Sequence, residues 1–153
     1  MSKLPTLLKS IYYHKWFPRI FFKKYDGGKE SNVHGYMLVE WKPVCSIGIL
    51  YFKKGSREVF HNHAFNAITW WLKGKVTELQ TSGVKKDFSP SLRPKITKRD
   101  CFHKVISHCN TYAITFRGPW NDTWKEIGKN GEVTLTHKRK VVDTNNKIFK
   151  EET

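Results

Sequence analysis

The stretch FHNHAFNAITWWLKG, Phe60 to Gly74, places two histidines one residue apart, before an apolar and aromatic run that ends at a glycine. In an extended strand, residues i and i+2 point to the same side, so we expect His61 and His63 to share one face. Two imidazoles on one face are a ready pair of metal ligands. The alternative is that both are polar residues of a loop beside a turn.

Short segments rich in β-branched and aromatic residues continue on both sides of this stretch. Gly, Pro, Asn and Asp separate them at near-regular intervals, which predicts an all-β sandwich or barrel rather than βαβ units. We find no internal repeat and no second domain. The predicted strands cover residues 35–41, 45–52, 58–63, 66–72, 75–80, 93–98, 111–116, 123–127 and 132–137.

The two ends of the chain differ from this central part. Residues 1–30 are predicted to be a basic N-terminal helical extension, in which Ser2 caps a helix that Pro18 ends. Residues 31–137 are then the single β domain. Residues 138–153 are predicted to be a polar, flexible tail.

The composition suits one domain of 153 residues, which is long enough to bury a core. No apolar run is long enough to span a bilayer, and the N-terminus does not resemble a cleavable signal. Three cysteines, an odd and small number, fit a reducing compartment. These features predict a cytoplasmic protein, in the host cytoplasm if the source is viral.

The net charge is +15 and is spread along the chain. Such a field attracts anions, including nucleic acid, nucleotides and small phosphorylated molecules, although solubility alone is an equally good explanation. No basic helix or RNA-binding signature accompanies the charge. The residues that we assign to an outer positive field are Lys85, Lys86, Arg93, Lys95, Lys98 and Arg99.

A third ligand for the histidine pair is His103 in RDCFHKV, where the chain returns after two further segments. A rival zinc site lies in CFHKVISHC and would use Cys101, His103, His108 and Cys109. Zinc modules usually separate their ligand pairs by a longer loop, and strand alternation would scatter these four side chains. We therefore favour His61, His63 and His103.

These motifs resemble those of the cupin superfamily. GSREVFHNHAFNAITWWLKG is similar to the first cupin motif, with Gly55, His-x-His and Gly74, and RPKITKRDCFHKV is similar to the second. From Ile47 to Val133 the chain resembles small uncharacterised cupin-domain proteins of bacteria and their phages. The resemblance implies a cupin-type β-barrel, that is, a double-stranded β-helix or jelly roll, with a divalent metal, and cupins often form homodimers.

One position departs from the usual cupin motif. A glutamate is expected four or five residues after the second histidine, where this chain has Ala67 and Ile68. The resemblance then implies a three-histidine site of the kind that cupin thiol dioxygenases use for iron. Fe(II) is the favoured metal, with zinc, manganese and nickel as alternatives. Glu78 replaces the missing carboxylate only if the barrel turns it inward.

Three further residues are candidates for substrate binding. In TYAITFR, Tyr112, Ile114 and Phe116 form one face, and the smaller face ends in Arg117. An arginine in a barrel interior can hold a carboxylate or phosphate through two hydrogen bonds, but Arg117 can equally pair with Asp122 or Glu126 at the rim. Asn66 is a polar residue at the start of an apolar strand, and Glu78 is the third candidate.

The leading hypothesis is a metal-dependent, iron(II)-type oxygenase, or a related enzyme, that acts on a small anionic substrate. No catalytic residue is assigned. One alternative is a non-catalytic cupin shell that binds a nucleotide or nucleic acid through its basic surface. Others are a sugar-phosphate or sugar-nucleotide isomerase or epimerase, which needs an acid–base pair that the sequence does not reveal, and a 2-oxoglutarate oxygenase, which needs Asp or Glu in place of His63.

Overall fold

The computed structural model describes residues 17–56, 59–136 and 139–145, and every regular element in these ranges is a β-strand. The all-β prediction is therefore confirmed. The strands are β1 (Arg19–Tyr25), β2 (Val33–Trp41), β3 (Cys45–Phe52), β4 (Gly55–Ser56), β5 (Phe60–His61), β6 (Ala67–Lys73), β7 (Val76–Gln80), β8 (Lys85–Phe88), β9 (Lys95–Thr97), β10 (His103–Ser107), β11 (Thr111–Arg117), β12 (Thr123–Gly128), β13 (Gly131–Thr136) and β14 (Val141–Asn145).

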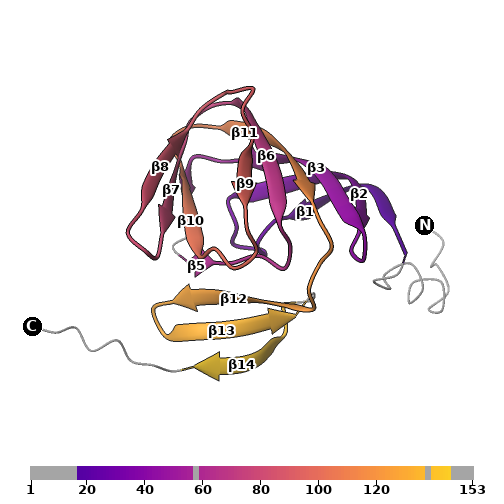
Figure 1. Cartoon of the computed structure of the whole chain (residues 1–153), viewed down its shortest axis with the longest axis vertical. Coiled ribbons are helices and arrows are strands. Elements are labelled where there is room, and N and C mark those ends of the chain that lie inside the picture. Colours follow the sequence, from indigo (N-terminus) through magenta and orange to yellow (C-terminus); the bar gives the residue numbers. More distant parts are fainter. Residues whose placement is uncertain (1–16, 57–58, 137–138, 146–153) are drawn as a thin grey trace, which may run out of the picture.

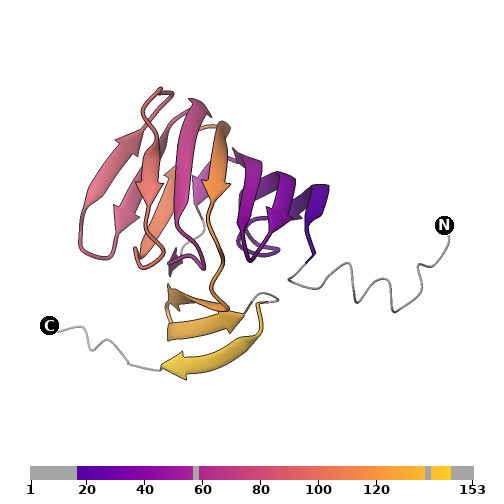
Figure 2. The same ribbon diagram turned by 45° about the vertical axis from the view of Figure 1, so that its right-hand side comes forward.

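The strands form two antiparallel sheets. One has the order β1-β2-β3-β11-β6-β9, and the other has the order β14-β13-β12-β5-β10-β7-β8, with β4 paired to β10. The crossover of β11 between β3 and β6 is visible in Figure 2, where an orange strand lies between magenta and purple ones. In Figure 1, β12, β13 and β14 form a layer below the other strands.

The prediction of a closed barrel was wrong, because the sheets stay open. Strands β9 and β8 end their sheets, and the chain between them carries Pro90 and Pro94. Proline has no backbone N–H and cannot donate to a ladder, so this segment crosses from one sheet to the other without joining them. The fold is a sandwich of two facing sheets.

The predicted domain limits also need correction at both ends. Residues 19–25 do not belong to a helical extension, because they form β1 and pair with β2 from Arg19↔Glu40 to Tyr25↔His34. Residues 141–145 do not belong to a loose tail, because they form β14 on β13. The helix predicted before Pro18 falls almost wholly on residues 1–16, outside the described residues, as do residues 146–153.

The space between the sheets contains an apolar cluster of Leu50, Phe52, Trp71, Val76 and Ala113. The burial of β11 alternates strictly, and its inner residues include Ala113, Thr115 and Arg117. The predicted division of this strand into two faces is confirmed. Because the inner side chains of β11 and β6 are mostly small, the two sheets enclose a cavity rather than a filled core.

A second cluster, Ala64, Phe65 and Ala67 with Trp120 and Trp124, closes the end of the sandwich nearest β12. Gly74 makes the turn from β6 to β7 with φ +92, and a Cβ on it would lie 2.2 Å from the Thr111 hydroxyl. Only glycine accommodates both the positive φ and this approach. Gly74 thus fixes the turn that connects β6 to β7.

Candidate metal centre

His61, His63 and His103 come together at the end of the cavity nearest β12, each from a different local setting. His61 ends β5, where it lies opposite both His103 of β10 and Glu126 of β12. His63 lies in the loop beyond β5, where its N–H donates to the Arg99 carbonyl. The prediction that His61 and His63 share a strand face was therefore wrong, since β5 ends at His61.

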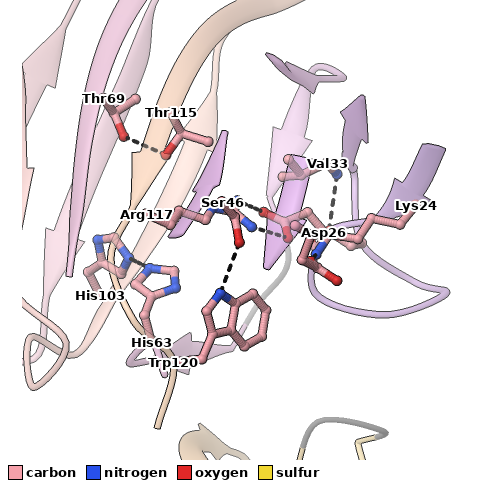
Figure 3. A network of polar contacts seen from close by, with 12 residues as sticks. Lys24, Asp26, Val33, Ser46, His63, Thr69, His103, Thr115, Arg117 and Trp120 are labelled. Carbon is pink, nitrogen blue, oxygen red and sulfur yellow. Dashed lines mark hydrogen bonds and ion pairs between the residues drawn. The ribbon is translucent and has the colours of Figure 1, made fainter. Parts of the chain in front are cut away.

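The three imidazoles nevertheless converge. One ring nitrogen from each lies within 4.8 Å of the other two. His63 Nε2 and His103 Nε2 are 2.9 Å apart, and Figure 3 shows these two rings pointing toward each other. Two nitrogens that bind one ion at about 2.0–2.1 Å, on adjacent positions at a right angle, are themselves about 2.9 Å apart. The donor set and its spacing fit a divalent metal.

Glu78 on β7 fixes the orientation of His103. Its Oε2 accepts a hydrogen bond from His103 Nδ1 at 2.7 Å, and both side chains are almost completely buried. The carboxylate thereby holds the Nδ1–H tautomer, in which Nε2 carries the lone pair that a metal needs. Glu78 does turn inward, but it supports a ligand instead of standing in the position of the missing motif glutamate.

Glu78 itself is held ionised by its neighbours. Burial alone would raise the pKa of its carboxyl group. The hydrogen bond from His103 and the charge of Lys95, which forms an ion pair with Glu78, outweigh burial and lower the pKa to about 2. An ionised Glu78 makes His103 a more basic ligand.

His63 is held neutral. Burial lowers its pKa well below the usual 6.5, and the nearby positive groups, including Arg117 and Lys95, lower it further. Neutral imidazole is the form that binds a metal. His63 therefore keeps its ligand form at neutral pH.

The cavity beside the histidines has a volume of about 100 Å³, which is room for a few waters or a small ligand. Its far end is apolar. The indole N–H of Trp71 is buried there without a hydrogen-bond partner in the described structure. The apolar lining residues are Val33, Leu50, Phe52, Trp71 and Val105.

Arg117 reaches the cavity from β11, as predicted, but it is not at the rim and pairs with neither Asp122 nor Glu126. Its two terminal nitrogens donate to the carboxylate of Asp26, Nη1 at 3.2 Å and Nη2 at 2.5 Å. Asp26 follows β1, and Figure 3 shows the pair next to the histidines. Burial would raise the pKa of Asp26, but Arg117 and Lys24 lower it to about 2.

Two other predicted positions take unexpected places. Asn66 is exposed and does not line the cavity, because its side-chain oxygen accepts from the Arg99 N–H. Lys95 was assigned to the outer field, yet its side chain is only 11% exposed, lines the cavity and pairs with Glu78. Thr69, in contrast, does face the cavity and donates to Thr115 at 3.3 Å.

The rival zinc site does not form. In the described part of the chain, the only group of three or more histidine, cysteine or acidic side chains with metal-binding spacing is His61, His63 and His103. His108 Nε2 instead lies 2.7 Å from the Thr77 hydroxyl. No described helix could cross a membrane.

Sequence reasoning missed Asp26 and the inward role of Lys95. Asp26 lies in the turn YDGG, whose sequence carries only a turn signal, and its partner is 91 residues away. No sequence pattern near either residue predicts that pairing.

Comparison with known proteins agrees with this architecture. No protein-family profile and no curated protein matches the sequence. Among solved structures, a putative ethanolamine utilization protein Q from Salmonella typhimurium aligns with TM-score 0.53 and 12% identity, over 64% of this chain and 78% of that one. An RmlC-like cupin from Shewanella frigidimarina aligns with TM-score 0.50 and 16% identity, over 63% and 83%.

The cupin domain of Cnp3 from Schizosaccharomyces pombe also aligns, with TM-score 0.50 and 11% identity, over 59% of this chain and 66% of that one. Identities this low carry information on the fold alone. Two facing antiparallel sheets, three histidines at one end of the cavity between them and these structural relatives lead to one conclusion: the chain has the fold of the cupin superfamily.

Proposed function

We propose that the protein is a metal-dependent cupin enzyme, an iron(II)-type oxygenase or a related enzyme, that acts on a small anionic substrate. The observation that carries the proposal is the convergence of His61, His63 and His103 at an interior cavity, with Glu78 holding one of them in its ligand form. Iron(II) bound by three neutral nitrogens keeps open positions, and its chemistry there is oxygen activation.

The charges around the cavity favour an anionic ligand. Lys95 and Arg117 are each matched by an ionised carboxylate, Glu78 and Asp26 respectively. The three histidines contribute no negative charge, so a divalent ion among them adds two positive charges, while Glu78 and Asp26 are already paired with Lys95 and Arg117. In a mostly apolar cavity an uncompensated charge is costly, and an anionic ligand removes that cost.

The shape of the cavity limits what the ligand can be. At about 100 Å³ it suits a molecule of few heavy atoms and is too small to enclose a nucleotide. The charged end would lie near the histidines and Arg117, and an apolar body would contact Leu50, Phe52 and Val105. A short, amphipathic carboxylate meets these demands.

The test has two stages and uses protein purified without a histidine tag. Elemental analysis and anaerobic Fe(II) titration establish whether one divalent ion binds per chain. Oxygen consumption is then measured with a panel of short carboxylates that differ in chain length. Binding of one ion with oxygen uptake that depends on one carboxylate class supports the proposal.

Matched variants make the result interpretable. His63→Ala should abolish both metal binding and oxygen uptake. Trp71→Phe, which changes the apolar lining of the cavity and none of the three histidines, should leave metal binding intact. Absence of metal binding in the native protein would refute the proposal.

The alternative function is a non-catalytic shell that binds nucleic acid or a nucleotide, which the net charge of +15 favours. It makes a different prediction. Nucleic-acid binding weakens steeply with salt, with a log–log slope of roughly −0.7 to −0.9 per phosphate neutralised, whereas a small ligand in the cavity shows a shallow dependence. Neutralising Lys85, Lys86 and Arg93 together should abolish oligonucleotide binding if the alternative is right, and leave carboxylate binding unchanged if it is wrong.

No described structural feature favours an isomerase or epimerase. Such chemistry needs an acid–base pair at the site. Among the described residues, no tyrosine lines the cavity, and the carboxylates that line or border it are already held in ion pairs.

A further inference from the structure

A continuous row of aromatic rings crosses the six-stranded sheet. Strands β1, β2, β3 and β11 are consecutive in this sheet, and in Figure 2 they run from the indigo β1 at the right to the orange β11. Each strand contributes one ring, and the strand registers place neighbouring rings opposite one another, in the order Tyr25, His34, Tyr51 and Tyr112. We call these four residues the aromatic row. On the next strand, β6, Lys73 lies opposite Tyr112 and ends the row.

The aromatic row lies on the side of the sheet that faces away from the cavity. On β3, Tyr51 stands between Leu50 and Phe52, and on β11, Tyr112 precedes Ala113. Leu50, Phe52 and Ala113 belong to the buried apolar cluster between the sheets. Because side chains of a strand alternate between its two faces, both tyrosines point outward.

The four rings contact one another along the row. Their centroids are 4.8 Å apart from Tyr25 to His34, 5.9 Å from His34 to Tyr51 and 4.9 Å from Tyr51 to Tyr112. His34 is almost completely buried, whereas the two end residues, Tyr25 and Tyr112, are 53% and 39% exposed. Neighbouring strands lie about 4.8 Å apart, so the row spans roughly 14 Å. The ends of the row therefore offer ring surface that the inner rings hold in place.

Three exposed lysines surround the aromatic row, and none of its own positions is acidic. Lys73 ends the row, and Lys53 follows the last residue of β3. The Nζ of Lys23 lies 5.3 Å from the ring centroid of Tyr36, which is two residues beyond His34 on β2. Burial lowers the pKa of His34, and the charges of Lys23 and Lys53 lower it further, so both cations act on the row.

We propose that the aromatic row is a binding site for single-stranded nucleic acid. Such sites combine aromatic rings, on which bases stack, with cations that follow the phosphates, and the row and its lysines supply both. A four-stranded sheet with aromatics on its surface is also the platform on which one common RNA-binding module stacks two or three bases. The net charge of +15 draws phosphates toward this surface. The site is separate from the three histidines and does not depend on the proposed function.

Two other occupants fit the aromatic row less well. A neutral sugar could stack on the tyrosines, but it would leave the three lysines without an anionic partner. A second copy of this chain would bring the lysines of both copies into one interface, where each buried cation needs a counter-ion. A phosphate backbone supplies that counter-ion, so the charges favour a nucleic acid.

The experiment measures fluorescence anisotropy of labelled single-stranded oligothymidylate and oligouridylate, each of about twelve nucleotides. The full chain is used without a histidine tag and in EDTA, so that the result is independent of metal binding and of the proposed function. We expect both single strands to bind more tightly than a duplex of the same length, because paired bases cannot offer their faces to a ring. A difference between the two single strands separates DNA from RNA as the natural source of the ligand.

Leucine variants at the two ends of the row test stacking directly. Tyr25→Leu and Tyr112→Leu keep an apolar side chain but remove the ring, and each should weaken single-strand binding between about 5-fold and 100-fold. Tyr112→Phe keeps the ring and should bind as tightly as the native protein. Thermal unfolding establishes that each variant is folded.

Salt dependence tests the lysines. If each of the three neutralises one phosphate, the log–log slope of affinity against salt is roughly −2 for a single strand. This slope should approach zero in the triple variant Lys23→Gln, Lys53→Gln and Lys73→Gln. The matched control makes the same change of charge in the outer positive field, and it should leave the slope unchanged: Lys85→Gln, Lys86→Gln and Arg93→Gln.

Three results would overturn the proposal. The first is the absence of single-strand binding at low salt with protein concentrations up to about 100 μM, well above a micromolar dissociation constant. The second is binding that both leucine variants leave unchanged, or that a duplex matches, since charge alone would then explain it. The third is binding that is lost in the control triple variant and kept in the other, which would move the site to the outer positive field.

Discussion

Replacing Glu78 by glutamine separates the support of a metal ligand from the ordinary stability of a buried ion pair. Glutamine keeps the size of the side chain and removes its charge. In the native protein the carboxylate accepts from His103 Nδ1 at 2.7 Å and pairs with Lys95. Its pKa lies at about 2 against an ordinary 4.5, so the folded state favours the ionised form by about 3 kcal/mol.

Two quantities should change in Glu78→Gln. Metal affinity should fall 10–100-fold, because the charge that fixes and strengthens His103 is gone. The free energy of unfolding of the metal-free protein should fall by about 3 kcal/mol at neutral pH, because Lys95 loses its counter-ion. Since the folded pKa is lowered, this contribution is present above pH 4.5 and disappears as the pH falls toward 2. Native protein and variant should therefore converge in stability near pH 2.

The assay combines competitive metal titration with urea unfolding at several pH values. Glu40→Gln is the matched control, because Glu40 is a buried carboxylate of β2 that pairs with Lys24 but contacts none of the three histidines. It should lower stability without lowering metal affinity. Equal metal affinities in native protein and Glu78→Gln, or an equal loss in Glu40→Gln, would refute the assignment of Glu78 as a ligand-orienting residue.

Three further predictions test the site and the fold. His103→Ala should lower metal affinity at least ~100-fold, whereas His108→Ala should not, as measured by elemental analysis of tag-free protein; metal loss in the second variant alone would restore the rival zinc site. Gly74→Ala should lower the free energy of unfolding by about 3 kcal/mol or more, because alanine is strained at the positive φ and its Cβ would clash with Thr111. Gly83→Ala, at φ +84 in open space, should lower it by only about 1 kcal/mol. Urea unfolding measures both variants, and similar losses would contradict the packing argument. Asp26→Asn should lower the free energy of unfolding by about 2 kcal/mol at neutral pH and make unfolding less sensitive to acid. The reason is that the lowered pKa of Asp26 supplies stability that is lost as the pH falls from 3.8 to about 2. An unchanged dependence of stability on pH would contradict this prediction.

Much of the architecture could be predicted from local patterns. The alternation in β11 already separated a large outer face from a small inner face ending in Arg117, because side chains in a strand alternate whatever surrounds them. The spacing of turn residues gave most strands. Strands β1, β4, β8, β10 and β14 were missed. Strands β4, β8 and β14 are short or polar and form through pairing with a neighbour, whereas β1 had been assigned to the predicted helical extension.

The sequence predicted which residues form the candidate site, but not which backbone segments bring them together. His61, His63 and His103 were named from a motif, yet they converge through a strand end, a loop and a second strand, and not through one strand face. A motif records which residues recur together. The backbone path that brings them together depends on hydrogen bonds to distant segments.

The sequence by itself determined the fold class, the three histidines and the sign of the field that surrounds them, because periodicity, residue type and net charge are local or additive properties. Only the tertiary structure decided that Arg117 binds Asp26, that Lys95 and Glu78 face inward to hold His103, and that the sheets stay open. Those outcomes depend on which groups share a buried space. No local sequence pattern predicts an ion pair between residues 91 positions apart, since the pair is stabilised only after folding has buried Arg117 beside Asp26.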